Sequence, residues 1–374
     1  MDISTGKFIM KNKRKNQILL LAVLVTCLAA SGPALAGSAT NPEDFNAFYA
    51  PSYKLPDPAA MDESAARGKE IIHSTYKYLG AESGVRASNG KPYVGNRLAC
   101  VNCHMDNGTR PNASPWVVGK LKYASPGVFN ARENTYRDLP VRINGCFERS
   151  MAGEPLPVDS QSMQDIVSYF GFLATGLQPG YSYKQVPGQD FPKLPTLATA
   201  ANPQRGAAIY QDSCKSCHQE DGQGVWRADE QRYRYPALWG ANSFSQAAGM
   251  GRLATAATLI NGNMPYDKVN SLDPRTRLSE QDVWDVTAYI LSKDRPFDAR
   301  FLKDWTGTGP TGVPNWLSRA PDAAYDYTMP RVDGLGLASD DPRFAPMFPL
   351  AQHRYGPFKP ITDALAKAKA YWGY

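Results

Sequence analysis

The sequence predicts an all-α, loop-rich fold in which one small helical unit occurs twice. The residues CVNCH at 100–104 return as CKSCH at 214–218. Each copy follows a helix-like segment, and a second such segment comes after a long loop, as MQDIVSYF at 163–170 and VWDVTAYI at 283–290. The chain holds 31 glycines and 30 prolines among 374 residues, which exceeds average usage and favours loops.

The first 36 residues predict a secretory signal peptide. Five basic residues lie within 7–15, an apolar run of 13 residues follows at 18–30, and ALA at 34–36 is a small-residue cleavage site. The run is shorter than the roughly 20 residues that a membrane span requires. We therefore expect cleavage after Ala36 rather than a retained anchor, and a mature chain outside the cytoplasm without a membrane span.

The net charge excludes one class of partner. Of the formal charge of +6, residues 1–36 contribute five basic residues and Asp2, so the mature chain carries only +2. Nucleic-acid binding requires a strong basic surface. We expect no nucleic-acid partner.

The repeated C-x-x-C-H pattern is the attachment signature of c-type haem. Its two cysteines form thioethers to one haem, and the adjacent histidine offers an imidazole nitrogen to the iron. A redox dithiol needs no following histidine, and a zinc site would need further ligands. The residues predicted to hold two covalently bound haem c groups are Cys100, Cys103 and His104, and Cys214, Cys217 and His218.

Helix, haem motif, long loop and helix form the layout of a class I cytochrome c domain, so we expect two such domains in tandem. Before the second motif, Asn202-Pro203 supplies a helix cap and a first-turn proline. Before the first, residues 62–79 carry apolar side chains at a period of 3.6 and predict a helix. The expected divisions are a signal peptide (1–36), an N-terminal cytochrome c domain (37–178), a linker (179–200), a C-terminal cytochrome c domain (201–298) and a Pro/aromatic-rich tail (299–374).

The ends of these units carry further signals. Ser162 with Asp165, and Ser279 with Asp282, are placed like capping boxes at the start of each unit's last helix.

The tail is expected to wrap over the domains as an extended arm that ends in a short helix near 361–372. We assign it no chemistry.

Each haem iron needs a ligand on the face opposite its histidine. In the second unit, Met264 lies 46 residues after His218, with Met250 as the main alternative. In the first unit the equivalent position holds Cys146, with Met151 as the conventional alternative. A lone cysteine in an exported chain is usually bonded, coordinated or reactive. We interpret Cys146 as an iron ligand rather than as a buried or disulfide-bonded thiol.

Arginines precede Cys146 at intervals of five, at Arg132, Arg137 and Arg142. Guanidinium groups match the geometry of oxyanions. By themselves these arginines could equally be surface residues or partners of haem propionates.

Five segments together resemble the dihaem thiosulfate dehydrogenase family: CVNCH, CKSCH, RENTYRDLPVRINGCFERSMAGEPLP at 132–157, NMP, and HRYGPFKPI at 353–361. The resemblance runs from about residue 45 to the C-terminus. It implies a periplasmic oxidoreductase that joins two thiosulfates into tetrathionate, in a reaction that can reverse. Electrons would pass from a catalytic haem in the first domain, through an electron-exit haem in the second, to an external acceptor such as a small cytochrome c.

The resemblance also implies roles for residues. His104 and Cys146 would ligate the catalytic haem iron, and His218 and Met264 the second. The substrate pocket would contain Arg132, Arg142 and Ser150, with weaker support for Arg137 and Arg149. Some members exchange a lysine for the methionine ligand, but Asn263 stands before Met264 here, so we expect no such switch.

The chemistry that follows is covalent. Cys146 released from iron could bond the outer sulfur of one thiosulfate, and a second thiosulfate could then attack that adduct.

Three alternative functions remain at this point: a dihaem electron-transfer cytochrome without a substrate, a dihaem peroxidase, and a carrier subunit of a sulfur-oxidation system. His73 and His353 lie outside the ligand loops, and we expect them to be structural.

Overall fold

The computed structural model describes residues 42–270, 273–322 and 348–374, so the predicted signal peptide lies outside the described residues. Its α-helices are α1 (Pro42–Tyr49), α2 (Glu63–His73), α3 (Thr75–Leu79), α4 (Met105–Gly108), α5 (Gly119–Lys122), α6 (Leu139–Arg149), α7 (Gln161–Ala174), α8 (Pro203–Ser213), α9 (Lys215–His218), α10 (Leu253–Asn263), α11 (Glu280–Leu291), α12 (Leu350–Tyr355) and α13 (Lys359–Trp372). Short 3-10 helices are η1 (Pro58–Ala60), η2 (Cys100–Asn102), η3 (Tyr183–Gln185), η4 (Gly249–Gly251), η5 (Pro274–Thr276), η6 (Ala299–Lys303) and η7 (Asn315–Ser318).

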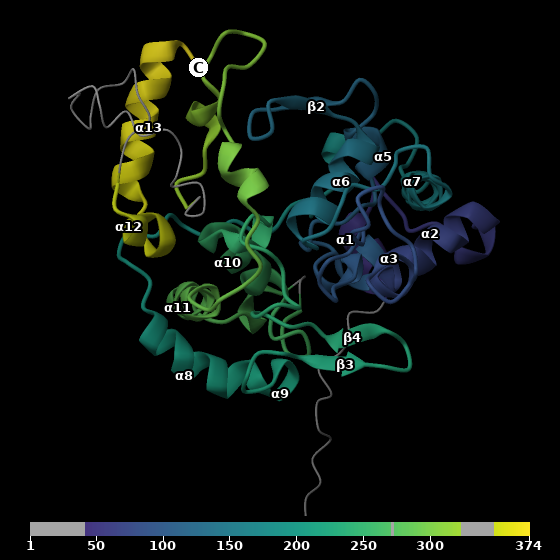
Figure 1. Cartoon of the computed structure of the whole chain (residues 1–374), viewed down its shortest axis with the longest axis horizontal. Helices are drawn as coiled ribbons and strands as arrows, with labels where there is room; N and C mark the ends of the chain where they lie inside the picture. The colour runs from purple at the N-terminus through teal and green to yellow at the C-terminus, as the bar shows by residue number, and fades with distance from the viewer. Residues whose placement is uncertain (1–41, 271–272, 323–347) are drawn as a thin grey trace, which may run out of the picture. The chain divides into compact units, whose positions relative to one another are not determined.

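The strands form two small antiparallel pairs, β1 (Val128–Asn130) with β2 (Thr135–Arg137) and β3 (Val225–Arg227) with β4 (Arg232–Tyr235). Figure 1 shows both pairs as short ribbons beside the helices. The described part of the chain is therefore helix-rich with few strands, in agreement with the predicted class.

Helix α2, which precedes the first haem motif, crosses α7 at a glycine. Gly68 lies so close to the backbone of Asp165 that a Cβ would clash with its carbonyl group. Arg67 donates to the Asp165 carboxylate from Nε and Nη2, both at 3.0 Å, and Ser64 and Gln161 also donate to it. Close backbone contact and a buried carboxylate together fix the crossing.

Helices α8 and α11 repeat the same crossing around the second motif. Gly206 lies against the carbonyl of Asp285, and Arg205 donates to the Asp285 carboxylate. Gln281 donates to the same carboxylate at 2.9 Å, as does the backbone amide of Asn202. The Arg-Gly pair on one helix and the aspartate on the other thus occur twice.

The helix predicted over residues 62–79 is wrong in one respect, because the chain breaks at Ser74 between α2 and α3. The break directs Thr75 toward the first haem motif. Its hydroxyl accepts a hydrogen bond from the amide of Cys100 at 3.1 Å and donates to the carbonyl of Ile72 at 3.2 Å. If α2 continued through Ser74, Thr75 would lose this hydrogen bond with Cys100 of the first haem motif.

The helix caps were predicted with mixed success. Asn202 caps α8 and Ser279 caps α11, as the sequence indicated. The cap of α7 is Ser160 rather than Ser162, and its hydroxyl accepts from the amide of Met163. Asp165 takes no part in capping because Arg67 and its neighbours engage it.

The described residues all fall within one compact unit, so the predicted domain divisions inside it remain predictions. Arg110, only 1% exposed, connects the segment after the first haem motif to the segment after α10. It donates to the Asn263 side chain at 3.0 Å and to the Val269 carbonyl at 3.3 Å, and its guanidinium lies 4.6 Å from the ring centre of Tyr266. Asn263 in turn donates to the carbonyl of Asn112 at 2.9 Å.

The C-terminal tail packs against the second half of the chain. The predicted short helix near 361–372 is part of α13, whose Ile361 and Leu365 are buried with Leu253 and Trp284. Figure 1 shows α12 and α13 in yellow. Within the described residues, no helix is both long and apolar enough to span a bilayer.

The glycine crossings yield a stability prediction. Gly206→Ala should destabilise the holoprotein by about 1–3 kcal/mol, because the added methyl group must push α8 away from α11. Thermal unfolding followed by circular dichroism measures the loss. Gly249→Ala serves as the control, since the nearest atom to its added Cβ would be Thr255 Cγ2, at 3.9 Å. Equal shifts for the two variants would contradict the proposed crossing.

Candidate functional site

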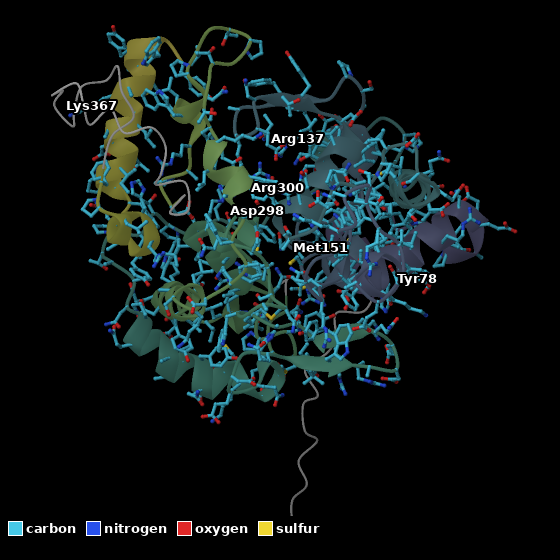
Figure 2. All side chains as sticks on the ribbon, in the orientation of Figure 1. Tyr78, Arg137, Met151, Asp298, Arg300 and Lys367 are labelled. Carbon is cyan, nitrogen blue, oxygen red and sulfur yellow. The ribbon has the colours of Figure 1, made fainter. Side chains whose placement is uncertain are left out.

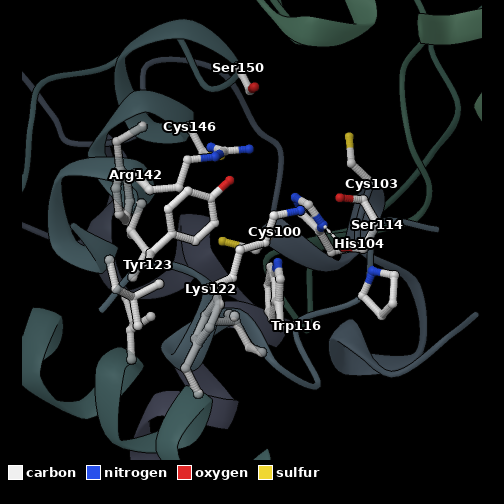
Figure 3. A pocket seen from close by; sticks show the side chains of 18 of the residues that line it. Cys100, Cys103, His104, Ser114, Trp116, Lys122, Tyr123, Arg142, Cys146 and Ser150 are labelled. Carbon is white, nitrogen blue, oxygen red and sulfur yellow. Dashed lines mark hydrogen bonds between the residues drawn. The ribbon is translucent and has the colours of Figure 1, made fainter. Parts of the chain in front are cut away.

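A largely apolar cavity lies beside the first haem motif, and Figure 3 shows it from close by. Cys100, Cys103 and His104 line it together with Cys146 from α6. We call it the motif cavity. The rest of its wall is mainly aliphatic and aromatic, with Ile72, Leu98, Trp116, Leu139, Ile143, Phe147, Met151, Ile166 and Phe170.

His104 is held in one orientation. Its Nδ1 lies 2.8 Å from the carbonyl oxygen of Ser114, so this nitrogen carries the proton and donates. Nε2 is then left with a lone pair, and a backbone carbonyl is a common partner of a metal-binding histidine. The ring also packs on Trp116 at 4.7 Å between centres. Two thiols, one oriented imidazole and an apolar wall fit a c-type haem.

The second motif presents its histidine in the same way. His218 is 8% exposed, and its Nδ1 lies 2.9 Å from the carbonyl oxygen of Pro236. Burial lowers the pKa of His218, which favours the neutral imidazole that a metal requires. Cys214 and Cys217 stand before it at the spacing of the first motif. This donor set also fits a covalent haem.

Cys146 lies on α6 and faces the imidazole of His104 across the motif cavity. Arg142, one helical turn earlier, donates from Nη1 to the Cys146 sulfur at 3.1 Å. Burial alone would raise the pKa of this thiol, but nearby groups, chiefly the charge of Arg142, lower the pKa of Cys146 to about 6. The sulfur is therefore poised as a thiolate, which is the form that binds metal or attacks. Among the described residues Cys146 forms no disulfide.

Helix α6 brings these groups together because of its periodicity. Asp138 caps the helix through the amide of Val141, and Arg142, Cys146 and Ser150 follow at intervals of four residues. Residues four apart share one face of a helix. The sequence predicted Cys146 in a ligand loop, but it lies inside this helix. Local spacing therefore sets the Arg142–Cys146 contact.

A second cavity, of about 720 Å³, adjoins the first and shares His104, Arg142, Cys146 and Ser150 with it. We call it the arginine cavity. Its size lies within the range of small-molecule sites. No aspartate or glutamate of the described residues lines it. Its arginines are Arg132, Arg137, Arg142, Arg149 and Arg252.

Two carboxylates just behind the wall hold three of these arginines in place. Asp304, 2% exposed, accepts from Arg132 Nε and Arg149 Nη2, both at 2.7 Å. Glu133 accepts from Arg149 Nε at 2.8 Å and pairs with Arg137. Burial, with the nearby charge of Arg149, lowers the pKa of Arg132 to about 10. Arg132 therefore remains charged near neutral pH.

The tail contributes to this cavity, although the sequence assigned it no chemistry. Asp304 and Trp305 directly follow η6. The amide of Trp305 donates to the carbonyl of Arg132 at 2.8 Å, and its ring centre lies 5.0 Å from the Arg132 guanidinium. Arg300, near Asp298 in Figure 2, adds a 3.2 Å contact to Glu154 after α6. The tail is thus part of the site wall.

The structure separates the candidate methionines. Met151 is 3% exposed and lines the motif cavity, but the contacts of the Cys146 sulfur with Arg142 and His104 favour the cysteine as the partner of that histidine. Met250, the alternative for the second haem, lines the arginine cavity instead. Met264 directly follows α10, and its ligand role stays a prediction.

Two histidines serve other contacts. His73 Nδ1 lies 3.0 Å from the side-chain oxygen of Asn107, and His353 Nδ1 lies 2.7 Å from the carbonyl of Pro321. Neither lines the motif cavity or the arginine cavity. Sequence reasoning missed Arg252, Asp304 and Trp305. In the sequence, Arg252 is simply an arginine before a helix, and Asp304 and Trp305 are an adjacent pair in the tail. Neither pattern indicates a functional site.

Comparisons with known proteins give one domain match and several relatives that match about two thirds or more of the chain. Residues 203–294 match the cytochrome c family model. The thiosulfate dehydrogenase of Stutzerimonas stutzeri is 34% identical over 257 residues, which cover 68% of this chain and 76% of the relative. That of Thiomonas intermedia is 31% identical over 309 residues, covering 80% of this chain and 89% of the relative.

A solved structure agrees. The thiosulfate dehydrogenase TsdBA of Marichromatium purpuratum, in its as-isolated form, is 30% identical with a TM-score of 0.57. The match covers 67% of this chain and 50% of that chain, so the present chain spans about half of the longer solved one.

The buried Asp304 yields a prediction about stability. Asp304→Asn should lower the free energy of unfolding by about 3 kcal/mol, because it removes the buried charge that Arg132 and Arg149 share. Chemical denaturation of the holoprotein measures this. The control is Asp298→Asn, whose partner Arg300 is 40% exposed, and it should cost less than about 1 kcal/mol. Similar losses for both variants would argue against a structural role of Asp304 in the cavity.

Proposed function

Because this chain belongs to the thiosulfate dehydrogenase family, we propose that it joins two thiosulfate ions into tetrathionate at a haem held by His104 and Cys146. Family membership bears out the resemblance found in the sequence and makes the chain a haem-containing oxidoreductase. The site residues, the product and the path of the electrons are the parts that the proposal adds.

The proposal includes two class I cytochrome c domains in tandem, at 37–178 and 201–298, each with one haem c. The family match over 203–294 supports the second. The first is supported by its own C-x-x-C-H motif and by the repeated helix crossing, with Arg67, Gly68 and Asp165 equivalent to Arg205, Gly206 and Asp285. The proposed donors are Cys100, Cys103, His104 and Cys146 for one haem, and Cys214, Cys217, His218 and Met264 for the other.

Substrate binding must overcome charge repulsion. Two thiosulfate dianions in contact repel each other by several kcal/mol even at an effective dielectric constant of about 20. The arginine cavity offsets this repulsion with fixed guanidinium forks. Arg142 donates to the sulfur of Cys146, Arg132 is held in the cavity wall by Asp304, and Ser150 adds a hydroxyl group.

Cys146 would act as the covalent sulfur carrier. Its thiolate and the outer sulfur of a first thiosulfate form a sulfur–sulfur bond, and two electrons leave. The second thiosulfate attacks the thiosulfate sulfur of this adduct, and the thiolate of Cys146 is released together with tetrathionate. The sum is two thiosulfates converted to one tetrathionate and two electrons, without proton transfer. Arg142 stabilises the thiolate both before and after the cycle.

The haems, when bound, supply the electron acceptors for this chemistry. We place the enzyme in the periplasm, where a small cytochrome c would take the electrons on. Since no proton is exchanged and every bond change is reversible, the same residues also suit the splitting of tetrathionate.

One observation carries the proposal: the Cys146 sulfur faces His104 and also borders a cavity with five arginines and, among the described residues, no carboxylate on its wall. A pure electron carrier needs no anion cavity at its haem. A peroxidase needs a displaceable ligand but not a cluster of guanidiniums. Thiosulfate-dependent reduction of ferricyanide, with no peroxide-dependent turnover, separates these classes, and activity of the isolated chain argues against a carrier subunit.

The role of Cys146 is testable by substitution. Cys146→Gly should leave both haems attached, remove the low-spin thiolate signal from the electron paramagnetic resonance spectrum, and lower turnover at least about 1,000-fold. Met151→Leu is the matched control and should retain both signal and turnover. Retained activity in the glycine variant would refute covalent catalysis by this sulfur.

The number of haems is testable by stoichiometry. A pyridine haemochromogen assay should give two haems per chain, and the double variant Cys214→Ala/Cys217→Ala should give one. That variant should also lose electron transfer to an external cytochrome while the thiolate signal of the first haem persists. A single haem in the unmodified protein would overturn the tandem arrangement.

A further inference from the structure

Arg252 belongs to the second half of the chain but lines the arginine cavity. It occupies the N-cap position of α10, directly after η4, and shares the cavity wall with Cys146 and Ser150. More than a hundred residues separate it from Cys146 in the sequence. The fold alone brings it to the site.

The guanidinium of Arg252 has no direct partner in the part of the chain that the structure describes. Its Nε is buried without a hydrogen-bond acceptor. The charge of Arg252 acts on the buried carboxylate of Asp322, whose Oδ2 already accepts from the amide of Ala254 at 2.6 Å. A buried donor left unsatisfied costs free energy unless something fills the position.

The other four cavity arginines are already engaged. Asp304 and Glu133 hold Arg132, Arg137 and Arg149, and Arg142 donates to the sulfur of Cys146. Arg252 stands close enough to Arg132 for its charge to lower the pKa of Arg132. The wall near Arg252 therefore concentrates positive charge while offering guanidinium donors that no described side chain uses.

The proposed reaction requires two dianions in succession. The first thiosulfate is bonded to Cys146 beside Arg142. The second must reach its outer sulfur from within the arginine cavity, against the charge of the first. A guanidinium with free donors on that wall, contributed by α10, meets this requirement.

We infer that Arg252 binds the sulfonate oxygens of the second thiosulfate. This inference rests on the proposed function and deepens it, because it makes the second half of the chain a direct contributor to substrate binding. The first half binds and activates one thiosulfate, and Arg252 positions the one that attacks.

The test uses the fully reduced holoprotein, which has no oxidised haem to accept electrons and therefore binds thiosulfate without turnover. Isothermal titration with thiosulfate measures binding, and steady-state ferricyanide reduction by the oxidised enzyme gives KM and kcat. The variants are Arg252→Gln and Arg252→Lys. The control is Arg275→Gln, whose side chain is 89% exposed and pairs with Asp273 outside both cavities. Haem content and visible spectra report on folding.

We expect Arg252→Gln to weaken thiosulfate binding and to raise KM by about 10- to 100-fold, with a smaller change in kcat. Arg252→Lys should fall between it and the unmodified protein, because it keeps the charge but not the fork. The control should stay within about twofold.

Binding and KM unchanged in Arg252→Gln, in a protein that does oxidise thiosulfate, would overturn the role of Arg252 and leave the proposed function standing. An unmodified holoprotein that neither binds nor oxidises thiosulfate would overturn both. If Arg252→Gln fails to assemble, a KM for Arg252→Lys equal to that of the unmodified protein overturns the need for a fork at this position.

Discussion

Mutual repulsion among guanidinium groups is the constraint on which this site depends. Arg132, Arg137 and Arg149 stand close together, and such a cluster is stable only with counter-charges. The fold supplies these from behind the wall, through Glu133 and the buried Asp304. The carboxylates fix the arginines without facing the cavity, so the inner surface keeps its positive character for an anionic ligand.

This arrangement draws on three parts of the chain. Helix α6 brings a thiolate and its arginine partner, the segment around η4 and α10 brings Arg252, and the residues after η6 bring Asp304 and Trp305. The tail is therefore a structural member of the site. Its Asp304 compensates the charges of two buried arginines, Arg132 and Arg149, that lie in the first half of the chain.

The sequence was sufficient for the features that depend on local spacing. The C-x-x-C-H motifs, the cap at Asn202 and the neighbourhood of Arg142 and Cys146 follow from residues within one or two helical turns. The placement of Arg252 and Asp304 could not be predicted, because it depends on how distant segments fold together. The sequence also failed to predict the helix break at Ser74, because the apolar period continues through that residue. The break is explained by a contact between distant residues, the hydrogen bond between Thr75 and Cys100.

Arg110 has a consequence for how such a chain can be recombined. It follows His104 by six residues and pairs with Asp106 beside it, yet it also donates to Asn263 and Val269, on either side of Met264. A chimaera that took its second half from another cytochrome would remove two acceptors from this buried guanidinium unless the donor also offered an amide and a carbonyl at those positions. The two halves are thus matched parts, and exchange between relatives must carry both sides of this contact at once.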